Sequence, residues 1–129
     1  MADSTFRFCP KCATPLVKKV HHEKERLLCE APGCGFIHWG NPLPVVAAII
    51  EHDGQVLLAR GRGWPEKVYA LVTGFLEAGE TPEAGVLREM KEETNLDGDV
   101  VSLVGVYPFE VRNEVIIAFH VRTRGDIKL

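Results

Sequence analysis

The run of residues GFLEAGETPEAGVLREMKEETNL, from Gly74 to Leu96, concentrates negative charge in a chain that is otherwise nearly balanced. It contains six glutamates, one arginine and one lysine, whereas the whole 129-residue chain has a formal net charge of −3. Thr81 followed by Pro82 favours a helix start, since threonine caps free backbone N–H groups and proline suits the first helical turn. Asn95 tolerates the left-handed conformation that ends many helices. The run therefore predicts a loop followed by an acidic helix.

The spacing of the predicted helix places three carboxylates, those of Glu89, Glu92 and Glu93, within an arc of roughly 100° beside the apolar side. Like charges at this spacing oppose helix formation by a few tenths of a kcal/mol per pair. Solvent and the neighbouring basic side chains can relieve this repulsion, or a cation can gather the carboxylates. Mg²⁺ and Mn²⁺ prefer carboxylate oxygens, and the glycines and glutamates of the loop before the helix favour such a site.

The same run resembles the Nudix box, the signature of the Nudix hydrolases. The resemblance is carried by Gly74 and Glu80 and by the positions from Arg88 to Leu96. It covers every specified position except Asn95, where a glycine is usual. Because both residues suit a left-handed helix end, we expect the turn to be retained.

The resemblance implies a loop-helix-loop that binds divalent metal and hydrolyses a nucleoside diphosphate linked to another moiety. The family's metal-binding glutamates correspond to Glu89, Glu92 and Glu93. Either Glu89 or Glu93 would activate the attacking water. The backbone carbonyl of Gly74 would contact the metal, and Arg88, paired with Glu80, would orient the neighbouring glutamates.

Four cysteines near the N-terminus form two short pairs, separated by sixteen residues. They are Cys9 and Cys12 in CPKC, and Cys29 and Cys34 in CEAPGC. In a reducing compartment such pairs hold metal more often than they form disulfides, and four thiolates fit a tetrahedral, structural Zn²⁺ site. Two disulfides or four inert thiols are the alternatives. With four thiolates available, His21 and His22 are expected at the surface.

Composition and charge limit the classes of protein and partner that the sequence allows. A hydrophobic content of 46% is typical of a globular protein, and a pI near 5.9 gives no general attraction to nucleic acid or anionic membrane. The basic residues Lys18, Lys19, Lys24 and Arg26 form only a modest stripe mixed with glutamates, so the sequence favours no nucleic-acid partner. No apolar run reaches the roughly 20 residues of a membrane span, and the first residues lack a secretory pattern. These features predict a cytoplasmic protein.

The predicted organisation is a zinc ribbon over residues 1–37, a linker over 38–44 and a Nudix domain over 45–129. Strands are predicted at 45–60, as a hairpin, and at 68–72, 99–107 and 114–122. With the helix, their order is β-β-β-α-β-β. The fold class is therefore α+β, a Nudix-type mixed sheet preceded by a ribbon.

A ribbon before a Nudix domain resembles the NADH pyrophosphatase branch and related members acting on ADP-ribose or FAD. That branch has a Ser-Gln-Pro-Trp stretch after the box, which Tyr107, Pro108 and Phe109 echo only in part, so NADH is not singled out. The usual domain continues into a second helix that covers the sheet, yet this chain stops at Leu129. Either that piece was removed or another subunit, as in a homodimer, covers the apolar surface.

Further residues are candidates for contact with a small nucleotide substrate. They are Arg60 and Arg62 for phosphate, Trp64 and Phe109 for ring stacking, and Glu77 and Glu114 for the metal or its water. Solvated arginines, packed aromatics and exposed carboxylates are the alternatives. The alternative to an enzyme is a nucleotide- or RNA-binding sensor with weak turnover on the same fold.

Overall fold

The computed structural model describes residues 6–128, and the chain divides into two compact units, Met1–Pro42 and Leu43–Leu129. Residues 1–5 and 129, at the ends of the predicted ranges 1–37 and 45–129, lie outside the described residues.

The first unit contains a three-stranded antiparallel sheet in the order β1-β2-β3. Its strands are β1 (Val17–His21), β2 (Lys24–Leu28) and β3 (Ile37–His38). His22 and Glu23, both with positive φ, make the two-residue turn between β1 and β2. The segment between the two cysteine pairs, ATPLVKKVHHEKERLL, thus forms a two-stranded ribbon. The third strand was missed because two residues carry no periodic pattern, and only their pairing with Leu27 and Leu28 defines them.

The second unit is built on a mixed five-stranded sheet, which confirms the predicted fold class. Its strands are β4 (Leu43–His52), β5 (Gln55–Leu57), β6 (Val72–Phe75), β7 (Asp97–Phe109) and β8 (Glu114–Arg124). They follow the order β5-β4-β8-β7, with β6 also paired to β4. The β4–β8 pair is parallel, and the other pairs are antiparallel. The helix α1 (Pro82–Thr94) precedes β7, and a short 3₁₀ helix, η1 (Glu110–Arg112), joins β7 to β8.

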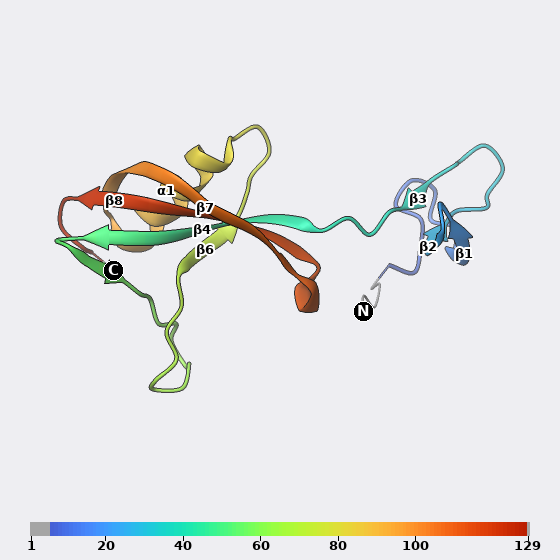
Figure 1. The fold of residues 1–129 in the computed structure, drawn as a ribbon. Helices are drawn as coiled ribbons and strands as arrows, with labels where there is room; N and C mark the ends of the chain where they lie inside the picture. Colours follow the sequence, from blue (N-terminus) through green and yellow to red (C-terminus); the bar gives the residue numbers. More distant parts are fainter. Residues whose placement is uncertain (1–5, 129) are drawn as a thin grey trace. The chain divides into compact units, whose positions relative to one another are not determined.

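The core of this unit lies between the sheet and α1, which packs against one side of the sheet (Figure 1). Val86 and Met90 of α1 are buried against a layer from the central strands, and Leu96 closes the layer after the helix. The strand residues of this layer are Val46, Ala48, Ile50, Val72, Phe119 and Val121. Each fully buried large apolar side chain contributes about 1.5–3 kcal/mol, so this layer fixes the position of α1 on the sheet.

Much of β7 remains uncovered. Its exposed apolar side chains include Val101, Leu103, Val104, Val106, Tyr107 and Phe109. Within residues 6–128, α1 is the only α-helix, so no second described helix covers this strand. No helix in the described part of the chain is both long and apolar enough to cross a membrane.

One predicted strand is displaced. The apolar residues 68–72 suggested a strand ending before Gly74, but β6 runs from Val72 to Phe75. Upstream, Ala59 and Ala70 form only an isolated bridge, with reciprocal backbone hydrogen bonds of 2.8 Å. Pairing with β4, where Gly74 lies opposite Val46, decides the boundary instead of local propensity. Gly74 is therefore a residue of the sheet.

Candidate functional site

The helix that carries the acidic residues begins and ends where the sequence predicts. The hydroxyl of Thr81 accepts a hydrogen bond from the N–H of Ala84 at 3.1 Å. At the other end, Asn95 adopts φ 68°, and its N–H bonds to the carbonyl of Lys91. These two caps fix where α1 begins and ends, and therefore the direction in which its glutamates point.

Arg88 organises the carboxylates around it. Its guanidinium donates two hydrogen bonds to Glu80, at 3.0 and 2.7 Å, and one to the carbonyl of Phe75, at 3.1 Å. Its Nη1 group also donates to Glu89 at 2.9 Å and to Glu92 at 3.3 Å. The expected Arg88–Glu80 pair is thus present as a two-bond contact, which is stronger and more directional than a single ion pair.

These contacts shift the protonation of the pair. Hydrogen bonds from Arg88 and from the N–H of Glu77 lower the pKa of Glu80 to about 2, and the neighbouring carboxylates raise the pKa of Arg88. Glu80 therefore stays ionised at neutral pH. It holds Arg88 in place and does not exchange protons there.

The Glu80–Arg88 pair predicts a defined loss of stability in acid. Because the pKa of Glu80 is lower in the folded chain than its ordinary 4.5, its contribution is complete above pH 4.5 and disappears as the pH falls toward 2. Thermal unfolding of the wild type and of Glu80→Gln, followed by circular dichroism, measures this. The wild type should be the more stable at pH 7, and the difference should shrink toward pH 2. A difference that stays constant with pH contradicts the assignment.

Gly74 and Glu89 are in close contact. A side chain at position 74 would collide with the Glu89 carboxyl group, whose side chain is only 15% exposed. The missing Cβ therefore lets the carboxylate lie directly against strand β6. A carboxylate held beside the strand by Arg88 is a suitable element of a cation site.

Gly74→Ala is therefore expected to destabilise the protein by about 1 kcal/mol, since the new methyl group pushes the end of the Glu89 side chain away and weakens its hydrogen bond with Arg88. Chemical denaturation measures the cost. In a Glu89→Ala background the same substitution should cost much less, because the colliding group is gone. Equal costs in the two backgrounds would show that the contact is not the reason Gly74 is required.

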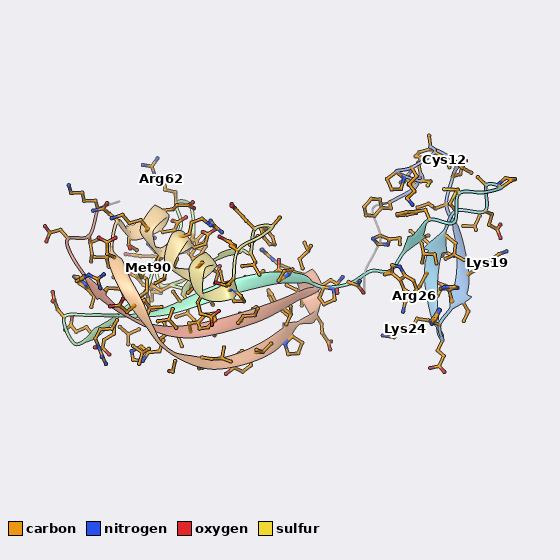
Figure 2. All side chains as sticks on the ribbon, turned by 90° about the horizontal axis from the view of Figure 1, so that it is seen from above. Cys12, Lys19, Lys24, Arg26, Arg62 and Met90 are labelled. Atoms are coloured by element: carbon orange, nitrogen blue, oxygen red, sulfur yellow. The ribbon has the colours of Figure 1, made fainter. Side chains whose placement is uncertain are left out.

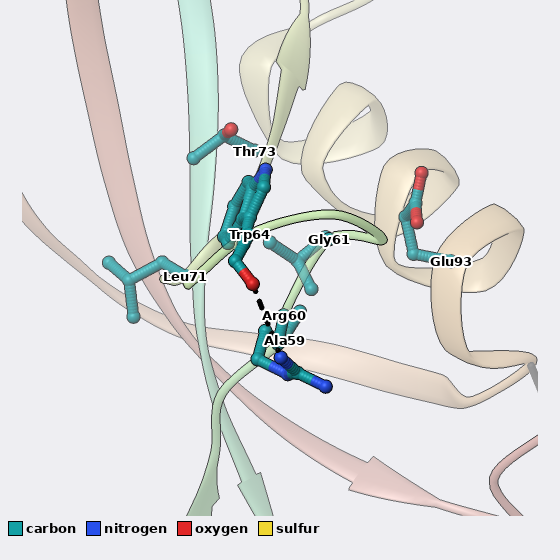
Figure 3. Close-up of a pocket in the computed structure, with 8 residues that line it drawn as sticks. Ala59, Arg60, Gly61, Trp64, Leu71, Thr73 and Glu93 are labelled. Carbon is teal, nitrogen blue, oxygen red and sulfur yellow. Dashed lines mark hydrogen bonds between the residues drawn. The ribbon is translucent and has the colours of Figure 1, made fainter. Parts of the chain in front are cut away.

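Beside these residues lies an open pocket of about 230 Å³ (Figure 3). Its lining includes Arg60, Gly61 and Trp64 from the loop after β5, Thr73 from β6 and Glu93 from α1. The Trp64 ring lies so close to Gly61 that a Cβ there would be 2.6 Å from the indole. Arg60 donates to the carbonyl of Trp64 at 3.4 Å. The pocket therefore joins an acidic side chain, a cation and an aromatic ring.

Other candidate residues lie in different places. Glu77 is 3.6 Å from Arg88 and belongs to the acidic group. Arg62 is exposed on the loop near Trp64. Phe109 and Glu114 pair with each other across the β7–β8 connection and are not among the residues lining the pocket.

The four cysteines converge on one point in the first unit. Their sulfur atoms all lie within 4.8 Å of one another, with Cys9–Cys34 at 3.6 Å and Cys12–Cys29 at 3.5 Å. A tetrahedral Zn²⁺ with bonds of about 2.3 Å requires sulfur separations of about 3.8 Å, whereas a disulfide requires about 2.05 Å. The arrangement thus fits a metal ion and no disulfide.

The thiols differ in acidity. Hydrogen bonding with Thr14 lowers the pKa of Cys12 to about 6. A backbone hydrogen bond at Ala31 lowers the pKa of Cys29, but burial and the neighbouring thiols raise it to about 12. Because a metal ion binds thiolates, it would have to displace the proton held by Cys29.

The three box glutamates are less tightly gathered than the cysteines. Among the described residues, only the cysteines bring three or more potential ligand atoms within 4.8 Å of one another. Glu89 and Glu92 are drawn to Arg88, whereas Glu93 lines the pocket. Mutual repulsion favours this separation. Mg²⁺ accepts one or two carboxylates and keeps several waters, so it does not require all three at contact distance.

Two family models match the chain along almost its whole length. The NUDIX domain matches residues 40–129, and the Nudix N-terminal zinc ribbon matches residues 7–39. The chain belongs to the NUDIX family.

Named relatives in the NUDIX family are about 30% identical in sequence to this chain. NAD-capped RNA hydrolase NudC of Vibrio atlanticus is 30% identical over 115 residues, which are 89% of this chain and 41% of the relative. The Pseudomonas aeruginosa (strain LESB58) protein of the same name is 30% identical over 114 residues, covering 88% and 40%. This NUDIX chain therefore spans less than half the length of these curated relatives.

Solved NUDIX structures support the fold. The crystal structure of a NUDIX hydrolase from Nitrosomonas europaea has a TM-score of 0.80 and 28% identity, covering 93% of this chain and 69% of that chain. A crystal structure of UDP-X diphosphatase has a TM-score of 0.60 and 29% identity, covering 69% and 46%.

The NUDIX unit also contains an ionic cluster that sequence reasoning missed. Glu51 accepts one hydrogen bond from Arg122 at 2.9 Å and contacts the ring of His120 at 3.0 Å. Arg122 and His120 together lower the pKa of Glu51. The parallel β4–β8 pairing brings these residues together, and no local sequence pattern predicts that pairing. His120 is thus held by Glu51 across the β4–β8 pair.

Proposed function

We propose that this chain hydrolyses the pyrophosphate bond of a nucleoside diphosphate linked to another moiety, of the ADP-ribose, NADH or FAD type, with Mg²⁺ or Mn²⁺. The main support is the juxtaposition of the Arg88-centred carboxylates with a pocket that Glu93 shares with Arg60 and Trp64. The name NAD-capped RNA hydrolase, carried by relatives at 30% identity, agrees with a nucleotide pyrophosphate as substrate.

The proposed cation ligands are Glu89, Glu92, Glu93 and the Gly74 carbonyl. A divalent cation bound there would neutralise pyrophosphate charge and make a coordinated water more acidic. Arg88 would fix the orientation of Glu89 against β6, so that the Glu89 carboxylate presents one fixed face to the cation. Glu93 or Glu89 would accept the proton of the attacking water.

In the same proposal, the pocket binds the substrate. Trp64 would stack on a planar ring, and Arg60 would contact a phosphate oxygen. Glu77 would support Arg88 or contact metal-bound water. The roles suggested for Arg62, Phe109 and Glu114 remain predictions from the sequence.

The N-terminal unit would have a structural role. We propose a zinc ribbon over residues 1–37 and a linker over 38–44, with the NUDIX hydrolase domain over 45–129. Zn²⁺ would be held by the four cysteines, whose thiols a reducing cytoplasm would keep available. The exposed apolar side chains of β7 support a homodimer in which a second copy covers that strand. Light scattering coupled to gel filtration tests this: a monomer at micromolar concentration would exclude the dimer.

A substrate panel tests the hydrolase proposal. ADP-ribose, NADH, FAD and UDP-linked sugars are incubated with the full chain and Mg²⁺ or Mn²⁺, and the released mononucleotide is quantified by chromatography. The proposal predicts product from at least one of them, and none when the divalent cation is omitted. Saturable binding without product, for every compound and both metals, would favour the sensor alternative.

A further inference from the structure

A second group of cations and aromatic rings lies in the first unit, and the hydrolase proposal does not use it. In the antiparallel pairing of β1 with β2, Lys19 lies opposite Arg26 and His21 lies opposite Lys24. Residues directly opposite each other project from the same face of a ribbon. Lys19, Lys24 and Arg26 therefore share one face of the β1–β2 ribbon, which we call the Arg26 face. The three residues are labelled in Figure 2.

The other face of the ribbon differs in charge. Lys18 pairs with Leu27 and Val20 pairs with Glu25, so these four residues project from the opposite face. Glu25 is the one acidic residue within β1 and β2. On the Arg26 face, Lys19 pairs with Glu30, which lies outside the two strands. The two strands thus place three of their four cations on the Arg26 face and their one carboxylate on the other face, with Lys18.

Trp39 extends the Arg26 face with an aromatic ring. The Arg26 guanidinium lies 5.0 Å from the centre of the Trp39 ring and also donates a hydrogen bond to the Trp39 carbonyl. The rings of His21 and His22 lie 5.4 and 5.5 Å from it. Trp39 nevertheless remains 41% exposed. A tryptophan held by a cation and two imidazoles is a rigid ring with a surface open to solvent.

The net charge of the whole chain does not reflect the charge of the first unit. Residues 43–129 contain nine Lys and Arg residues against fourteen Asp and Glu residues, whereas residues 1–42 contain six against four. The slight overall acidity therefore belongs to the NUDIX unit, and the low pI says nothing against an anionic partner for the ribbon.

We propose that the Arg26 face with Trp39 binds single-stranded nucleic acid. Such a strand presents phosphates to cations and unpaired bases to an aromatic ring, which is the combination this face offers. A duplex keeps its bases stacked inside, and a polyphosphate has no rings. The surface lies wholly within the Met1–Pro42 unit, so the proposal does not depend on the hydrolase activity.

The experiment uses the zinc-loaded full chain without Mg²⁺, so that hydrolysis plays no part. Because Trp39 and Trp64 are the two tryptophans of the sequence, a Trp64→Phe background makes Trp39 the only fluorophore of its kind. A 12-nucleotide single-stranded RNA is titrated in. The proposal predicts saturable quenching of Trp39, with log affinity falling as log salt rises, by about 0.7 for each phosphate neutralised.

Matched variants separate the face from general charge. Lys24→Gln should weaken binding about threefold or more, since it removes a cation from the face. Trp39→Leu should weaken it about tenfold; because this variant lacks the fluorophore, its affinity and that of its parent are measured by the fluorescence anisotropy of a dye-labelled RNA. Lys18→Gln removes the same charge from the opposite face and should leave affinity unchanged. Zinc content, measured for each variant, confirms that the ribbon is intact.

The outcomes are distinct. Quenching by the single strand that is lost in Lys24→Gln and retained in Lys18→Gln supports the proposal. It is overturned if the two lysine variants weaken binding equally, if a duplex or inorganic polyphosphate of the same charge binds as tightly, or if no binding occurs at low salt.

Discussion

Glu92→Gln and Glu93→Gln are each expected to lower turnover by about 100-fold or more while leaving the fold intact. Loss of a residue that merely supports a metal ligand commonly costs 10–100-fold, and a direct ligand or base should cost at least as much. Both side chains are at the surface of α1, so glutamine fits without strain. The measurement is kcat on the best substrate of the panel, with the unfolding temperature as the check on folding.

Glu83→Gln is the matched control. Glu83 is an exposed acid in the first turn of the same helix and is not one of the carboxylates bound to Arg88. Its replacement should leave kcat within about twofold of the wild-type value. If Glu92→Gln and Glu93→Gln both turn over substrate as fast as the wild type, the assignment of the site is rejected.

Removal of zinc is expected to unfold the first unit and spare the second. Among the described residues up to Pro42, only Cys9 and Cys29 are buried, so bound zinc would take the place of a hydrophobic core. Binding of structural Zn²⁺ contributes about 10–16 kcal/mol to the folding of comparable small modules. Hydrogen exchange after chelation should show β1 and β2 unprotected, while β4 and β8 keep their protection.

Zinc restoration is the control for this experiment. Adding Zn²⁺ back to the reduced protein should recover the protection of β1 and β2, and Cys29→Ser should behave like the chelated wild type. Persistent protection of β1 in protein shown to contain no zinc would mean that the thiols are not what holds the unit together.

The parts of the structure that follow from local rules could be predicted from the sequence. The limits of α1 follow from Thr81 and Asn95, whose side chains and backbone preferences act within one helical turn. The Glu80–Arg88 contact follows from the family motif and is present at 2.7 Å. The approach of four cysteines to one point follows from their spacing.

Other parts depend on contacts distant in sequence. The boundary of β6 is set by pairing with β4, and the contact between Gly61 and Trp64 comes from a loop with no periodic pattern. Lys18 and Lys19 project from opposite faces because they are neighbours in one strand, and the register of β1 with β2 places Lys24 and Arg26 on the face of Lys19. A count of basic residues treats these two lysines alike, so it missed a face that the pairing creates.

The proposed hydrolase requires a divalent cation held beside the pocket by Glu89, Glu92 and Glu93. Calorimetric titration of the zinc-loaded chain with Mn²⁺, in the presence of a non-hydrolysable ADP-ribose analogue, tests it most directly. Saturable Mn²⁺ binding is expected, and it should disappear when Glu89, Glu92 and Glu93 are all replaced by glutamine. Unchanged binding in that variant, or none in the wild type, would contradict it.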